Sequence, residues 1–115
     1  LRYHGAGTIV SQLKEDGYME AVDIPQLESF KAGTLFAQAE GIIPAPESCH
    51  AIASTIREAL KAKEEGVRKT ILFNLSGHGL IDMAAYDQYN AGNLVNYELP
   101  DSTIHESIDK LEKLI

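Results

Sequence analysis

The sequence has 115 residues, with 17 Asp and Glu residues against 10 Lys and Arg residues, which gives a formal net charge of −7. This length predicts a single domain, residues 1–115, and 44% hydrophobic residues exclude wholesale disorder. The acidic balance, without a basic stripe, disfavours nucleic-acid binding, and the apolar runs are far shorter than the roughly 20 residues that cross a bilayer. The single cysteine, Cys49, excludes an internal disulfide and favours a cytoplasmic location.

The first half of the chain predicts two helices and two short strands. Apolar residues at helical spacing favour a helix over Thr8–Asp16, and the loose alternation of Tyr18–Ile24 is typical of a strand. Pro25 suits the first turn of a helix that runs to about Ala39. A short strand through Ile42 and Ile43 follows it.

The second half predicts three helices and two strands. A helix is expected from Ser48, as its cap, to Glu65, and the unbroken apolar run Thr70–Leu75 predicts an interior strand. A helix over Asp82–Asn90, a weak strand over Val95–Glu98 and a helix over Ser102–Leu114 complete the pattern. Alternating helices and strands indicate an α/β fold of three layers, with a mainly parallel sheet covered by helices on both faces.

Two segments are candidates for ligand binding. Ser76-Gly-His-Gly79 follows the strongest predicted strand, where open parallel sheets bind their ligands. Glu40-Gly-Ile-Ile-Pro-Ala-Pro-Glu-Ser48 is stiffened by two prolines, and Glu40 or Glu47 could reach a ligand. From the local pattern alone, a plain turn between core elements is favoured over a ligand site for both segments.

Histidine and cysteine predict no metal site. The four histidines (His4, His50, His78 and His105) do not fall at metal-ligand spacing, and one cysteine cannot complete a zinc site. His78, between two glycines, is the one most suited to line a site, whereas Cys49 is expected to be a small buried residue.

The candidate segments together resemble the C-terminal part of the tryptophan synthase beta chain family, and are most similar to its second, beta-like group. Four stretches carry the resemblance: Leu1-Arg-Tyr-His-Gly5, Phe30-x-x-Gly33, the run from Glu40 to Ile52, and Asn74-Leu-Ser-Gly-His-Gly79. The chain also opens at Leu1, without Met, in a Gly-punctuated loop, so a fragment of a longer protein is expected.

The resemblance implies an enzyme of fold type II that uses pyridoxal 5′-phosphate (PLP) to join L-serine to indole, forming L-tryptophan and water. Ser76 matches the serine that contacts the pyridine nitrogen, and Glu40 matches the glutamate on the 3′-oxygen side of the ring. Gly77 and Gly79 match the glycines that shape the loop. The common beta chain has Arg and Asp where this chain has His78 and Leu80, so a charge switch on those residues is in doubt.

In this family the lysine that forms the Schiff base, and the loop that holds the cofactor phosphate, lie upstream of this segment. None of the lysines here occupies such a motif, so no catalytic residue is expected in this chain and the chain alone should be inactive. Exposed apolar surface should cause self-association or a homodimer, and binding of an alpha subunit is left open. The alternative is a non-catalytic α/β module that pairs with a separate N-terminal partner.

Overall fold

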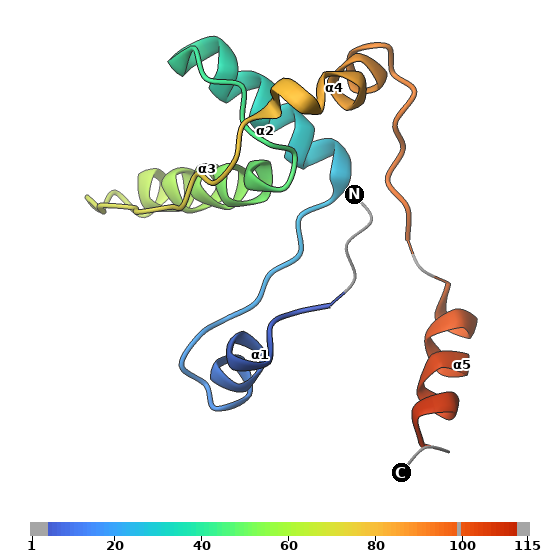
Figure 1. The fold of residues 1–115 in the computed structure, drawn as a ribbon. Coiled ribbons are helices and arrows are strands. Elements are labelled where there is room, and N and C mark those ends of the chain that lie inside the picture. Colours follow the sequence, from blue (N-terminus) through green and yellow to red (C-terminus); the bar gives the residue numbers. More distant parts are fainter. Residues whose placement is uncertain (1–4, 99, 113–115) are drawn as a thin grey trace.

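The computed structural model describes residues 5–98 and 100–112, which form five α-helices and one 3₁₀ turn (Figure 1). The elements are α1 (Thr8–Glu15), α2 (Gln26–Glu40), α3 (Ser48–Glu64), η1 (Gly79–Ile81), α4 (Met83–Asn90) and α5 (Asp101–Glu112). Helix α2 packs against α3 and α4, and η1 packs against α4. Helices α1 and α5 lie apart from this group, at the ends of extended segments.

The predicted parallel sheet is wrong. The only β-pairing among the described residues is a single antiparallel bridge between Pro44 and His78. Residues 70–75, predicted as the interior strand, make no backbone hydrogen bond in this part of the chain, and Leu72 is 93% exposed. A strand is completed by neighbours that take up its donors and acceptors, and no other described segment lies in register with this one.

The predicted helices are confirmed to within one or two residues over the described range. Pro25 lies just before α2, in an extended conformation, and Gly41 ends that helix with a φ of 70°. The predicted end of the last helix, Leu114, lies outside the described residues. The short turn η1 was not predicted, because three residues are too few to carry a helical pattern.

The main core is formed where α2, α3 and α4 meet. It consists of Phe30, Cys49 and Tyr86, each at most 4% exposed. The ring centroids of Phe30 and Tyr86 lie 5.3 Å apart, edge to face, and Tyr89 stacks on Phe30 at 5.5 Å. Both arrangements suit the charge distribution of aromatic rings, so one phenylalanine joins α2 to both tyrosines of α4.

A second cluster lies between α2 and α3. Ala32, Ile52 and Ala53 are buried there, and small residues let the two helices approach closely. Phe36 of α2 meets Phe73 edge to face, with ring centroids 6.0 Å apart. This contact ties residues 70–75 to the helices although the segment forms no sheet.

An ion pair joins the outer surfaces of α2 and α3. The guanidinium of Arg57 donates from Nε to Glu28 Oε1 at 2.6 Å and from its NH2 group to Glu28 Oε2. This two-point hydrogen bond lowers the pKa of the Glu28 carboxyl. The side chains are 45% and 37% exposed, so solvent screening limits what the pair adds to stability.

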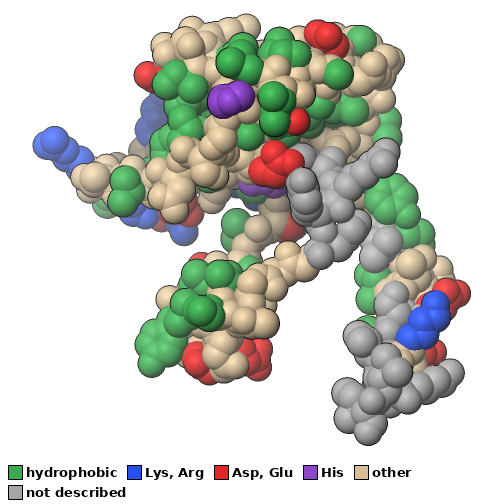
Figure 2. All heavy atoms as spheres, viewed as in Figure 1, with side chains coloured by type: hydrophobic (Ala, Val, Ile, Leu, Met, Phe, Trp, Pro, Cys, Tyr) green, Lys and Arg blue, Asp and Glu red, His purple; other side chains and the backbone are tan. Residues whose placement is uncertain are grey.

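The surface carries many apolar side chains. The radius of gyration is 16.9 Å, whereas a compact domain of this length has about 13 Å. Hydrophobic side chains lie on the outside of α1 in Figure 2, among them Ile9 at 75% exposed. No helix among the described residues is long and apolar enough to span a membrane.

Gly33→Ala is expected to lower the free energy of unfolding by about 1–3 kcal/mol, because an added Cβ would lie 2.3 Å from Cys49 Sγ and 3.0 Å from the Tyr86 hydroxyl. This sign opposes the usual gain of 0.5–1 kcal/mol or so for Ala over Gly inside a helix. Urea unfolding followed by circular dichroism measures the effect.

The control repeats Gly33→Ala in a Cys49→Ala background, where the sulfur is gone and the Cβ of residue 49 lies 3.4 Å from the added methyl group. The substitution should cost clearly less there. Equal costs in both backgrounds would contradict the close approach of α2 and α3 at this sulfur.

Candidate functional site

The two candidate segments, predicted separately, lie against each other. The Gly79 N–H donates to the Ile43 carbonyl at 2.8 Å, and the bridge between Pro44 and His78 continues the contact. At the other end, the Ser48 hydroxyl donates to the Ser76 carbonyl. Residues 76–79 and 43–48 therefore form one unit, which we call the paired loops.

The prediction that Ser48 only caps a helix is wrong. Ser48 is the first residue of α3, and the preceding position, Glu47, makes no side-chain capping bond. The Ser48 side chain is buried, at 6% exposed, and its hydroxyl crosses to the other loop. Local sequence gives no signal for this contact, because the donor and the acceptor lie 28 positions apart.

The two glycines of residues 76–79 are required for different reasons. Gly77 has a φ of +74°, a conformation that L residues with a Cβ rarely adopt. Gly79 is buried, and a Cβ there would lie 2.5 Å from the Pro44 carbonyl oxygen and 2.7 Å from Ile43 Cγ2. One glycine thus turns the loop, and the other allows the two backbones to touch.

The predicted cofactor-binding residues differ in their exposure and in the element that carries them. Ser76 and Gly77 are exposed on the paired loops, Gly79 is buried within them, and Glu40 is exposed as the last residue of α2. Within residues 5–98 and 100–112, no hydrogen bond joins the Glu40 and Ser76 side chains. That these two residues line one concavity stays a prediction.

The Ser76 side chain fits the role that the resemblance implies for it. Its hydroxyl is exposed and makes no hydrogen bond within the described part of the chain, while its own carbonyl is held by Ser48. A hydroxyl can donate or accept, so a fixed and available one suits a neutral ring nitrogen.

Histidine and cysteine have structural contacts here. His78 Nδ1 accepts from the Leu80 N–H at 3.3 Å and so caps η1. His50 Nδ1 lies 3.1 Å from the Glu47 carbonyl oxygen, within hydrogen-bonding distance. Cys49 is fully buried, as predicted, and burial raises the pKa of its thiol. The described residues contain no group of side chains suited to a metal ion.

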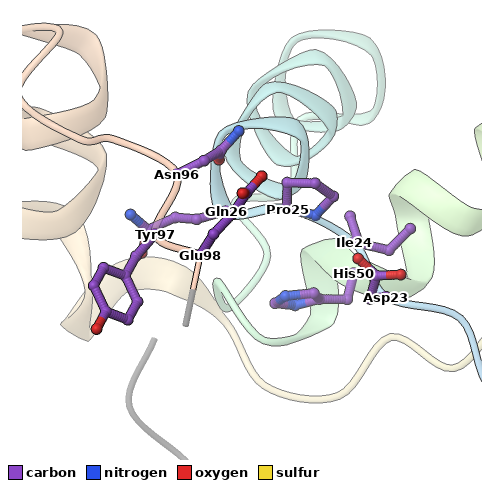
Figure 3. A pocket seen from close by; sticks show the side chains of 8 residues that line it. All are labelled: Asp23, Ile24, Pro25, Gln26, His50, Asn96, Tyr97 and Glu98. Atoms are coloured by element: carbon purple, nitrogen blue, oxygen red, sulfur yellow. The ribbon is translucent and has the colours of Figure 1, made fainter. Parts of the chain in front are cut away.

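Sequence reasoning missed a cavity of about 370 Å³ that lies away from the paired loops. It is lined by residues 23–26, His50 and residues 96–98 (Figure 3). Its outer wall is held by Asn96 Oδ1, which accepts from the Leu27 N–H at 3.0 Å at the start of α2. This cap comes from 69 positions away, so helix-start patterns cannot reveal it.

Known proteins match the chain closely along most of its length. The tryptophan synthase beta chain 2 of Methanosarcina acetivorans is 58% identical over 95 residues, which cover 83% of this chain and 22% of that protein. The protein of the same name from Aquifex aeolicus is 55% identical over 84% of this chain and 22% of its own length. The one from Pyrococcus furiosus is 48% identical over 95% of this chain and 24% of its own length. No family model matches.

By these similarities, the chain belongs to a class of biosynthetic enzyme subunits, the synthase beta chains. It belongs to the tryptophan synthase beta chain family, as the resemblance of its motifs indicated. The chain spans about a fifth of the length of the curated relatives it matches.

Gly79→Ala is expected to separate the paired loops, because the new Cβ cannot fit against the Pro44 carbonyl and the Ile43 side chain. The free energy of unfolding should fall by about 1–3 kcal/mol, and the amide hydrogen of residue 79 should exchange faster. Gly7→Ala is the matched control, since a Cβ there would have its nearest contact at 4.0 Å. Equal effects of the two substitutions would contradict the close approach.

Proposed function

We propose that this chain forms one wall of the PLP site in an enzyme that joins L-serine to indole and releases water. The observation that carries the proposal is the exposed Ser76 hydroxyl on a loop fixed by Ser48 and by the bond between Gly79 and Ile43. Identities of 48–58% to tryptophan synthase beta chains support the reaction class. PLP supplies a conjugated ring that withdraws electrons from the substrate's α-carbon.

Ser76 sets the character of the ring in this proposal. A hydroxyl is too weak an acid to hold the pyridine nitrogen protonated, whereas a carboxylate at that position would do so. The neutral nitrogen restrains delocalisation into the ring, which favours loss of the serine hydroxyl over competing reactions. The role therefore needs a neutral side chain held in place, and Ser76 is one.

Glu40 and the glycines complete the wall. The Glu40 carboxylate can accept a hydrogen bond on the side of the ring that carries the 3′-oxygen. Gly77 and Gly79 shape the loop of this wall: Gly77 turns it at a positive φ, and Gly79 lets it pack against Pro44 and Ile43. His78 and Leu80 stand where the common beta chain has Arg and Asp, so no charge switch is proposed on those two residues.

The remaining parts of the site are proposed to lie outside this chain. In the family the Schiff-base lysine and the phosphate loop lie outside the matched segment, so this chain contributes binding and orientation and no catalytic residue. The chain by itself is expected to bind PLP weakly and to form no tryptophan. A homodimer and a cytoplasmic location stay predictions, and the alpha subunit stays an open partner.

The function is tested in a chimera in which this chain replaces the matching segment of the Thermotoga maritima tryptophan synthase beta chain 2, to which it is 58% identical over 86 residues. Ser76→Asp should lower tryptophan formation relative to racemisation of serine, a competing reaction that keeps the serine hydroxyl, by about tenfold, equivalent to roughly 1.4 kcal/mol in the competing barriers. Product ratios by chromatography measure the effect.

Two variants separate charge from other effects. Ser76→Ala removes the hydroxyl without adding charge, and Thr70→Asp adds the same charge to an exposed residue outside the loop. Thr70→Asp should leave the product ratio unchanged. If Ser76→Asp also leaves it unchanged, Ser76 does not face the ring nitrogen and the proposed function fails.

A further inference from the structure

We propose that Ser48 is a positioning residue for the cofactor, acting through Ser76. The inference rests on the proposed function, because it is the Ser76 hydroxyl that Ser48 would aim. Ser48 binds the Ser76 carbonyl and leaves the Ser76 hydroxyl exposed. It therefore acts on the direction of that hydroxyl and needs no contact with the cofactor itself.

The Ser48 hydroxyl serves the loop and does not cap its own helix. A serine that caps a helix stands before the first turn and accepts from an N–H there, whereas Ser48 is already the first residue of α3. Here no side chain caps α3, and the buried hydroxyl donates to a residue 28 positions away. Ser48 and Ser29 are the buried polar residues in the described part of the chain. The buried Ser48 hydroxyl is thus used for a contact with the candidate site.

Holding the Ser76 carbonyl fixes the peptide that joins Ser76 to Gly77. Rotation of that peptide changes ψ of Ser76 and φ of Gly77 together, and glycine tolerates such rotation at low cost. A Cβ on Gly77 would lie 3.2 Å from Ala45 Cβ, so the turn at Gly77 packs closely against residues 43–48. Without the Ser48 hydroxyl, no other described hydrogen bond holds the Ser76 carbonyl.

The second fixed point lies three residues further on. The Gly79 N–H binds the Ile43 carbonyl at 2.8 Å, and the neighbouring Pro44 carbonyl accepts from the Tyr86 hydroxyl at 2.6 Å. Fixed at both ends, the backbone of the four-residue loop holds the Cα–Cβ bond of Ser76 in a limited range of directions. Removal of the Ser48 anchor frees one end of the loop, so the remaining bond from the Gly79 N–H to the Ile43 carbonyl should open more often.

The positioning role is first tested in this chain without cofactor. Ser48→Ala should speed hydrogen exchange at the Gly79 amide, which donates to the Ile43 carbonyl, by about tenfold relative to the unchanged chain, whereas exchange at the exposed Gly77 amide should stay the same. Thr55→Val is the control: it removes another α3 hydroxyl, which donates within the helix to the Ala51 carbonyl at 2.8 Å. Equal exchange at the Gly79 amide in the two variants would show that Ser48 does not hold the loop, and would overturn the inference.

The role toward the cofactor is tested in the chimeric holoenzyme with PLP as the probe. Ser48→Ala should weaken PLP binding about tenfold and shift the absorbance of the bound cofactor in the same direction as Ser76→Ala. The double variant should be no worse than Ser76→Ala alone, since both remove one interaction. Thr55→Val should change neither value.

Ser48→Thr keeps the hydroxyl and should restore most of the affinity and the absorbance. If it behaves like Ser48→Ala with an unchanged unfolding midpoint, the hydrogen bond is not the cause and the inference is overturned. If Ser76→Ala shifts the absorbance and Ser48→Ala does not, the proposed function stands and the inference fails. If Ser76→Ala itself has no effect, the proposed function fails and the inference fails with it.

Discussion

The hydrogen bond from the Tyr86 hydroxyl to the Pro44 carbonyl is the contact on which the rest of this structure depends. Pro44 is fully buried and its carbonyl lies away from water, so it needs a donor from within the protein. Tyr86 provides that donor at 2.6 Å. Burial, with the Cys49 sulfur beside it, raises the pKa of Tyr86, so the hydroxyl keeps its proton and remains a donor at neutral pH.

The structure around this bond follows from it in steps. Tyr86 and Cys49 occupy the space beside Gly33, which brings α2 to within contact of α3 and α4. Cys49 and Ser48 open α3 together, so the placement that buries the sulfur also buries the neighbouring hydroxyl. That hydroxyl holds Ser76, and the paired loops are therefore a consequence of the core beneath them.

The sequence predicted local structure well and long-range structure poorly, for physical reasons that particular residues illustrate. Helix bounds depend on nearby signals such as Pro25 and Gly41, and these were confirmed. Thr70–Leu75 was predicted as a strand from its apolar residues, but a strand depends on neighbours, and none pairs with it among the described residues. The family resemblance pointed to Ser76 and Glu40, whereas the bond from Ser48 spans 28 positions and no local rule predicts it. Gly33 is the place where α2, α3 and α4 touch, and no local pattern predicts that contact.

The most direct test of this account is Tyr86→Phe, which removes one oxygen and keeps the ring against Phe30. Tyr89→Phe is its match, because Tyr89 also packs on Phe30 and its hydroxyl makes no hydrogen bond in the described part of the chain. Tyr86→Phe should lower the free energy of unfolding by about 1–3 kcal/mol, since it leaves the Pro44 carbonyl buried without a donor, and should speed exchange of the Gly79 amide. Tyr89→Phe should change both values little. Equal and small effects of the two substitutions would contradict the claim that the bond between Tyr86 and Pro44 holds the paired loops in place.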